Sequence, residues 1–193
     1  MSFSPEKAIG LDMLEKNLKK AAVDPNIKGI YLNVMDVMTG YSFVDEIRQM
    51  FKEFKESGKF IIAYSEVYSQ KAYYLASVAD KVYINPKGMM MFKGLNAEIM
   101  FFKGALEKLD VEVQIIRPDN NKFKSAVEPF FRKDMSEANR IQYSRLFNSL
   151  WNEVLENISA SREISKEKLN DIADNLLANS PESTKELGLT DGT

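Results

Sequence analysis

The first 65 residues alternate between two kinds of apolar pattern. Apolar residues recur at helical spacing over residues 11–21 and 42–57, with polar residues on the other face. Each stretch is followed by a short continuous apolar run, at residues 29–34 and 60–64, which is typical of a buried strand. Gly58 ends the second helix. The order helix, strand, helix, strand predicts a parallel sheet covered by helices, and therefore an α/β fold class.

The rest of the chain continues this alternation and then becomes helical. The pattern predicts, in order, a helix over residues 69–78, a strand over 81–84 closed by a turn at 85–88, a helix over 98–109, a strand over 111–116, a turn over 118–121, a long helix over 136–161 and a helix over 165–175. In the last of these helices we expect Leu169, Ile172 and Leu176 to be buried and Ser165 to be the N-cap.

Composition narrows the chemistry that the chain can support. The chain is 45% apolar and 28% charged, and it contains neither cysteine nor histidine. A cysteine nucleophile, a disulfide, a thiolate metal site and a Ser-His-Asp triad are therefore excluded, and a general base must be a carboxylate, a lysine or a tyrosine. No cofactor or metal is expected. The net charge of −2 gives no electrostatic basis for binding nucleic acid.

The length of the chain sets its expected organisation. A chain of 193 residues suits one α/β domain, which we place over residues 1–193, with its core at about 1–130 and a helical extension at about 131–189. No apolar run approaches the roughly 18 residues that a membrane-spanning helix needs. The first ten residues lack the basic and then apolar pattern of a signal peptide.

Lys124 is the residue with the clearest chemical potential. It lies in the stretch KFKSAVEPF at residues 122–130, between Phe123 and two small apolar residues. A lysine shielded from water loses its proton more readily and can act as a neutral general base. The alternative is a surface lysine on a capped turn, which is the common situation for this residue type. Ser125 is not expected to be its partner, because adjacent helical residues point about 100° apart.

A family resemblance extends over nearly the whole chain. The stretch KSAVEPF at residues 124–130, followed by RKDMS at 132–136, closely resembles the lysine motif of the signal peptide peptidase A (protease IV) family. Further similarity to that family lies in DPNIKGI at 24–30, YYLASVADKVY at 73–83 and NPKG at 85–88. The resemblance implies a ClpP/crotonase-like superhelix of strand-helix units with a C-terminal helical extension. It also implies that Lys124 is the general base for a serine nucleophile.

The nucleophile position departs from the family pattern. Serine-bearing domains of the family carry Ser-Gly-Gly directly before paired aromatic residues, and alignment on Tyr73 and Tyr74 puts Gln70 at the serine position. Ser69 is one residue away, which is a rotation of about 100° on a helix, so its hydroxyl is expected to point elsewhere. Of the family's glycine-rich oxyanion loop only Gly40 remains, so an oxyanion hole of backbone N–H groups is not evident.

These departures resemble the long, tandem members of the family, whose N-terminal domain supplies the lysine and whose C-terminal domain supplies the serine. The resemblance implies that this chain is the lysine-contributing half of a Ser-Lys endopeptidase for signal peptides and other apolar peptides, and that it is inactive alone. It further implies homo-oligomers on the extracytoplasmic side of the bacterial envelope, attached to the membrane through a segment outside this chain. The expected lining of the substrate groove is Met89, Met90, Met91 and Phe92.

Three alternatives stay open. The chain could be a non-catalytic scaffold that binds peptide or holds an oligomer together, with Lys124 as a relic. It could be a crotonase-like acyl-thioester enzyme, although the paired backbone donors that such an enzyme needs are not evident. Ser69 could also act with Lys124 within one chain, against the geometric argument above.

Overall fold

The computed structural model describes residues 9–116 and 122–193, so the turn expected over 118–121 lies outside the described residues. The chain divides into two compact units, which are described separately. Unit 1 comprises the chain up to Gly94 and again from Val154 onward, and unit 2 comprises residues 95–153. The organisation of the chain as a single domain stays a prediction.

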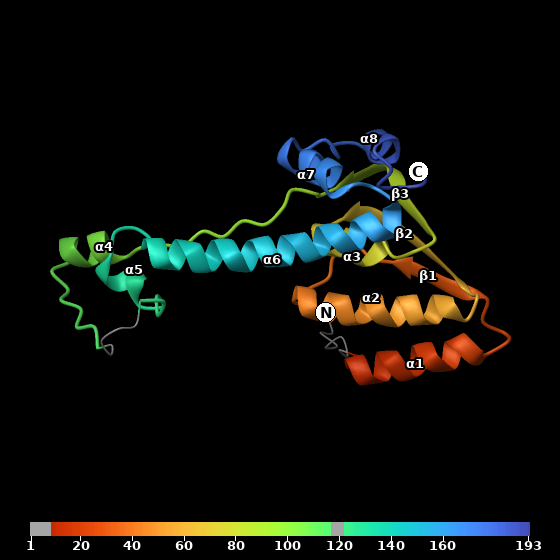
Figure 1. Cartoon of the computed structure of the whole chain (residues 1–193), viewed down its shortest axis with the longest axis horizontal. Helices are drawn as coiled ribbons and strands as arrows, with labels where there is room; N and C mark the ends of the chain where they lie inside the picture. Colours follow the sequence, from red (N-terminus) through yellow and green to blue (C-terminus); the bar gives the residue numbers. More distant parts are fainter. Residues whose placement is uncertain (1–8, 117–121) are drawn as a thin grey trace, which may run out of the picture. The chain divides into compact units, whose positions relative to one another are not determined.

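Unit 1 is built on a parallel sheet (Figure 1). Its described strands are β1 (Gly29–Asn33), β2 (Phe60–Tyr68) and β3 (Lys81–Met90), in the order β1-β2-β3. Neighbouring strands pair in parallel, with Ile30 opposite Ile61 and Ala63 opposite Val82. Ile61, Ala63 and Val82 are fully buried. The predicted α/β fold class is confirmed.

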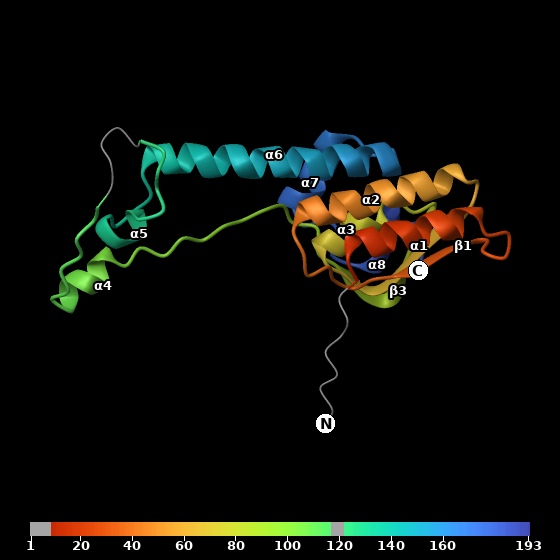
Figure 2. The same ribbon diagram turned by 90° about the horizontal axis from the view of Figure 1, so that it is seen from below.

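Two helices lie side by side next to this sheet (Figures 1 and 2). They are α1 (Leu11–Val23) and α2 (Tyr41–Glu56). Helix α2 ends as the sequence predicts, because Gly58 adopts a φ of +80° that side-chain-bearing residues rarely accept. Its buried face consists of Val44, Arg48, Phe51 and Phe54.

Arg48 is an unexpected member of this buried face, being only 1% exposed. Its guanidinium donates to the backbone oxygen of Tyr74 and to the Ser77 hydroxyl at 2.7 Å. It also donates to the backbone oxygen of Asn157 and the hydroxyl of Ser161, both at 3.2 Å. Burial lowers the pKa of this group, and the hydrogen bonds of its two terminal nitrogens replace part of the water that burial removes. The residue therefore fastens α2 to two other helices of unit 1.

Those two helices are α3 (Gln70–Ala76) and the last turns of α6 (Glu137–Arg162). Helix α6 begins one residue later than expected and ends one residue later, so the predicted long helix is confirmed. Unit 1 is completed by α7 (Lys166–Asp174) and α8 (Pro181–Glu186). The Ser165 hydroxyl accepts from the N–H of Lys168 at 3.2 Å, which confirms the predicted N-cap.

Strand β3 runs to Met90 and is therefore longer than the expected strand over residues 81–84. The segment expected to close the strand at 85–88 is an irregular bulge within β3, because Ile84 pairs with Ser65 and Met89 with Val67, so residues 85–88 lie outside the register of the ladder. Gly88 permits this. A Cβ atom at that position would lie 2.3 Å from the backbone oxygen of Glu66.

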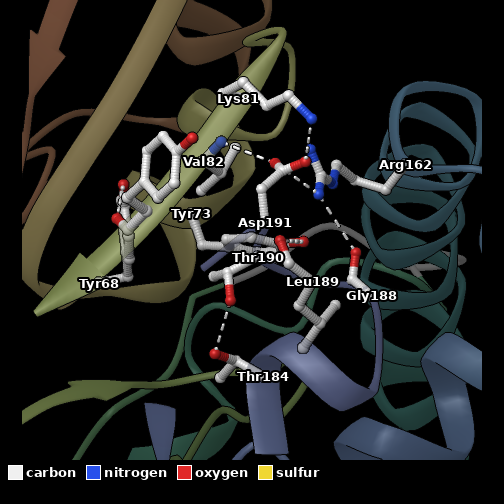
Figure 3. A network of polar contacts seen from close by, with 11 residues as sticks. Tyr68, Tyr73, Lys81, Val82, Arg162, Thr184, Gly188, Leu189, Thr190 and Asp191 are labelled. Carbon is white, nitrogen blue, oxygen red and sulfur yellow. Dashed lines mark hydrogen bonds and ion pairs between the residues drawn. The ribbon is translucent and has the colours of Figure 1, made fainter. Parts of the chain in front are cut away.

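The C-terminal residues fasten onto the start of β3 (Figure 3). The Asp191 carboxylate accepts from the N–H of Val82 at 2.9 Å. It also pairs with Lys81 and Arg162, each at 3.0 Å. Nearby, the fully buried Tyr73 donates its hydroxyl to the backbone oxygen of Leu189 at 2.9 Å. This polar cluster joins β3, α3 and the end of α6 to the chain that follows α8.

Unit 2 contains less regular structure than its sequence predicts. Its described helices besides α6 are α4 (Lys103–Lys108) and α5 (Glu128–Phe131), so the helix expected over 98–109 is shorter. The strand expected over 111–116 is wrong: the segment pairs with no strand among the described residues. Val111 and Ile116 are 49% and 91% exposed. An alternating apolar pattern forms a stable strand only where a neighbouring strand and a covered face are present.

Candidate functional site

Ser69 is the N-cap of α3. Its hydroxyl oxygen accepts from the N–H of Ala72 at 3.2 Å, and its own N–H donates to the backbone oxygen of Met35 at 2.9 Å. A hydrogen bond from Ser69 and one from the N–H of Val37 lower the pKa of the Asp36 carboxyl. The hydroxyl is therefore engaged on both sides, as a capping serine is. No motif in the sequence indicated Asp36 as a neighbour of Ser69.

Gln70, at the nucleophile position, has its side-chain amide bonded on both ends. Its Oε1 accepts from the backbone N–H groups of Lys93 and Gly94 at 2.9 and 3.0 Å. Its Nε2 donates to the backbone oxygen of Gly94 at 3.0 Å and to the hydroxyl of Tyr41 at 3.1 Å. Burial raises the pKa of Tyr41, which keeps the phenol protonated. Gln70 thus ties the segment after β3 to the start of α3.

The loop between β1 and α2 offers oxygen atoms to the start of α3. The backbone oxygen of Met35 accepts from Ser69, and that of Thr39 accepts from the Lys71 ammonium at 2.7 Å. An oxyanion hole needs the opposite polarity, namely N–H groups directed at the nucleophile position. This arrangement agrees with the loss of the glycine pattern around Gly40.

The four residues 89–92 form the methionine strip. Met90 and Phe92 point into the core, whereas Met89 and Met91 are 51% and 38% exposed, as alternation along a strand requires. A cavity of about 240 Å³ opens beside the strip. It is lined by Met89, Met90, Met91, Phe92, Lys93, Leu176, Ala178 and Asn179.

Leu176 corrects a sequence expectation. We expected it on the buried face of the preceding helix, but it lies past the end of α7 with a φ of +50° and is 58% exposed. Leu169 and Ile172 are fully buried, as expected. The apolar spacing suggested that the helical face includes Leu176, but α7 ends at Asp174 and Asn175 is its C-cap. Leu176 instead contributes an apolar wall to the cavity beside the methionine strip.

Lys124 lies in unit 2, on the turn that precedes α5, and its side chain is exposed. Among the described residues, no hydrogen bond or ion pair engages its Nζ atom. Its neighbour Ser125 donates to Oε1 of Gln142 on α6 at 3.4 Å, which directs that hydroxyl toward the helix. The shielding that a neutral lysine requires is therefore absent from the described part of this chain.

Glu128 fixes the end of the Lys124 turn. The carboxylate is only 4% exposed, and its Oε2 accepts from the N–H of Ser136 at 3.2 Å and from the amide of Asn139 at 3.0 Å. Burial raises the pKa of Glu128, but the bonds from Ser136 and Asn139 outweigh it and lower the pKa overall. A buried carboxylate thus joins α5 to the first turn of α6 and limits where Lys124 can lie.

The described structure brings some predicted site residues together. Ser69, Gln70 and the methionine strip belong to unit 1 and are connected through Lys93, which donates to Gln70 and lines the cavity. Lys124 belongs to unit 2. Sequence reasoning did not identify three residues of this region, because each is a single residue outside any motif: Gly94, Tyr41 and Leu176.

The parallel α/β fold of unit 1 is consistent with a ClpP-like fold. The chain matches the sequence model of peptidase family S49 over residues 53–192 and belongs to that family.

Three relatives illustrate the similarity. The chain is 38% identical to Protease 4 of Haemophilus influenzae and 39% identical to Protease 4 of Salmonella typhi, in each case over 79% of this chain. It is 34% identical to the chloroplastic serine protease SPPA of Arabidopsis thaliana over 78% of this chain. These matches cover 25%, 24% and 22% of the relatives' own lengths, so the chain spans about a quarter of each.

Within residues 9–116 and 122–193, no helix combines the length and apolar character needed to cross a bilayer. In those ranges, no three acidic side chains gather in a way that could hold a metal ion.

Proposed function

We propose that this chain is the lysine-contributing half of a Ser-Lys endopeptidase, with the serine supplied by another domain. The observation that carries the proposal is the combination of family membership, the intact lysine motif at Lys124 and a glutamine at the nucleophile position. The relatives, about four times as long as the matched region, have room for a further domain that bears the serine.

The chemistry of the proposed site follows from a neutral Lys124. Its Nζ takes the proton from the serine hydroxyl as the serine oxygen attacks the carbonyl carbon of the scissile peptide bond. The resulting ammonium gives that proton to the leaving nitrogen, and an acyl-serine remains. A water molecule then attacks the acyl carbon with the same lysine as base, which releases the second product and restores the serine hydroxyl.

The exposed position of Lys124 supports a shared site. A lysine that is to act as a neutral base must be removed from water, and the described residues do not cover it. A second domain that docks over the turn would supply the cover and the serine together. The buried Glu128 anchors the turn from below and leaves Nζ available for that partner.

The methionine strip supports an apolar peptide as substrate. The cavity beside it holds about 240 Å³, enough for one or two aliphatic side chains, and its exposed walls are methionine and leucine. By resemblance we also propose homo-oligomers at the extracytoplasmic face of a bacterial membrane, attached through a segment outside this chain.

A peptide-binding scaffold is the second candidate. It is favoured by the capping role of Ser69 and by the carbonyl-lined loop at Met35 and Thr39, which together leave the described residues of unit 1 without an evident nucleophile or oxyanion hole. In that case the chain would hold peptide or partner domains, and Lys124 would have no catalytic role.

Hydrolysis of an apolar fluorogenic peptide separates these candidates. The assay compares this chain, a serine-bearing domain of the family, and the two joined in one polypeptide. We expect cleavage by the joined protein alone. Cleavage by this chain alone would mean that the whole catalytic site lies within this chain. Equal cleavage by the serine-bearing domain with and without this chain would mean that this chain acts only as a scaffold.

A further inference from the structure

The Gln70 side chain makes the hydrogen bonds of a peptide group. In a hydrogen-bonded pair of two antiparallel strands, one residue gives its N–H to the other's carbonyl and accepts the other's N–H. Gln70 does the same with Gly94: its Nε2 donates to the Gly94 oxygen at 3.0 Å, while its Oε1 accepts from the Gly94 N–H at 3.0 Å. The N–H of Lys93 donates to the same Oε1 at 2.9 Å.

The location of this amide is where a ligand is expected in such a fold. Strand β2 ends at Tyr68, whose oxygen accepts from the N–H of Met91 at 2.8 Å. Beyond Tyr68 the backbone turns into α3, and the Gln70 amide takes up the hydrogen bonds of Lys93 and Gly94 in the segment after β3. In open parallel sheets, ligands bind at the carboxyl ends of the strands.

The Gln70 side-chain amide can move away from Gly94 without a change of the backbone fold. Its side chain is only partly buried, and side-chain torsions alone carry the amide to Gly94. Gly94 adopts a φ of +78°, and a Cβ atom built there would meet nothing within 4 Å, so the space around this backbone is open. Lys93 also lines the cavity beside the methionine strip.

We propose that the backbone of Lys93 and Gly94 is a docking position for one peptide group of an extended apolar peptide, and that the Gln70 amide occupies this position in the peptide-free chain. The peptide displaces Gln70, takes over its hydrogen bonds and places a side chain in the cavity of the methionine strip. This inference rests on the proposed peptide-binding role of the chain, and it adds an internal competitor that weakens binding.

The substitution Gln70→Met tests the proposal, because it keeps the length and removes the amide. Fluorescence anisotropy with a fluorescein-labelled peptide of alternating Ala and Leu reports binding to the 193-residue chain. We expect binding roughly three- to tenfold tighter in Gln70→Met, since the peptide no longer competes with the three N–H···O bonds between the Gln70 amide and the backbone of Lys93 and Gly94. Methylation of the peptide nitrogen that faces Gly94 should abolish this gain, whereas methylation one residue away should not.

Equal or weaker binding by a folded Gln70→Met chain would overturn the proposal and make Gln70 a structural brace. If that variant does not fold, the proposal is tested on the wild-type chain by ¹⁵N NMR, which follows the side-chain amide signals of Gln70 as peptide is added. Release of the amide predicts that these signals move to solvent-exposed positions on peptide saturation, and unmoved signals would contradict it. Absence of binding in every form also overturns the inference, but leaves the hydrolysis assay of the joined protein unaffected.

Discussion

Single residues decide which groups of this chain are available for chemistry. Ser69 and Lys124 are both candidate site residues, yet the described structure treats them differently. Ser69 caps α3 and is bonded to Ala72 and Asp36, whereas Lys124 is exposed and no bond in the described residues holds its Nζ. A side chain that satisfies a helix start is already committed to structure.

Replacing Ser69 with alanine is therefore expected to affect stability and not activity. The loss of an N-cap costs roughly 1 kcal/mol of unfolding free energy, which urea denaturation measures. Ser165→Ala is the matched control, because Ser165 caps α7 with the same 3.2 Å bond and has no candidate catalytic role. Both variants should retain full hydrolysis in the joined protein. Loss of hydrolysis in Ser69→Ala with an active Ser165→Ala would instead identify Ser69 as a nucleophile.

At the scale of elements, the charge cluster around Asp191 holds the C-terminal segment on β3 (Figure 3). Burial raises the pKa of Asp191, but the bonds from Val82 and Lys81 and the charge of Arg162 outweigh it, so that the pKa is lowered. Because the pKa of Asp191 is lower in the folded chain than its ordinary value of 3.8, the ionised carboxylate stabilises the fold at pH values above 3.8. This stabilisation is lost as the pH falls through the lower pKa of the folded chain.

Asp191→Asn is thus expected to lose roughly 1–3 kcal/mol of unfolding free energy at neutral pH. The difference from the wild type should narrow as the pH falls below 3.8, which chemical denaturation at a series of pH values would measure. Asp134→Asn is the control, since the Asp134 side chain is 78% exposed and its pair with Arg132 should contribute nothing measurable. A difference that stays constant down to low pH would contradict the ionic origin of the effect.

The sequence predicts elements where local pattern and tertiary context agree. Helices α2, α6 and α7 follow from their apolar spacing and their caps. The strand over 111–116 could not be rejected from sequence, because its alternating pattern is real and what it lacks is a neighbouring strand among the described residues. The extension of β3 through residues 85–88 could not be predicted either, since it depends on the close approach of Gly88 to Glu66.

In the candidate site, too, some features could be predicted from the sequence and others could not. The lysine motif and the methionine strip are contiguous in sequence and could be found there. The bonds between Gln70 and Gly94 join residues 24 positions apart, and the contribution of Leu176 to the cavity depends on where α7 ends. Buried Arg48 was hidden for a related reason, because its partners on α3 and α6 lie far along the chain.

At the scale of the whole molecule, this chain spans about a quarter of its relatives, and each of its two units carries candidate functional residues of its own. Unit 1 contributes the Gln70 amide and the methionine strip, and unit 2 contributes Lys124. Neither unit provides both a nucleophile and a shielded base among its described residues. The Ser-Lys site that we propose therefore needs a serine from another domain.

The most direct test of that account is the hydrolysis rate of the joined protein with Lys124→Ala. Lys122→Ala is the matched control, since Lys122 is equally exposed in the same segment. Loss of the general base predicts a fall in kcat of roughly 10²- to 10⁴-fold for Lys124→Ala, with the control close to wild type and both variants equally stable. Hydrolysis by Lys124→Ala at the rate of the Lys122→Ala control would contradict the account and leave this chain as a scaffold.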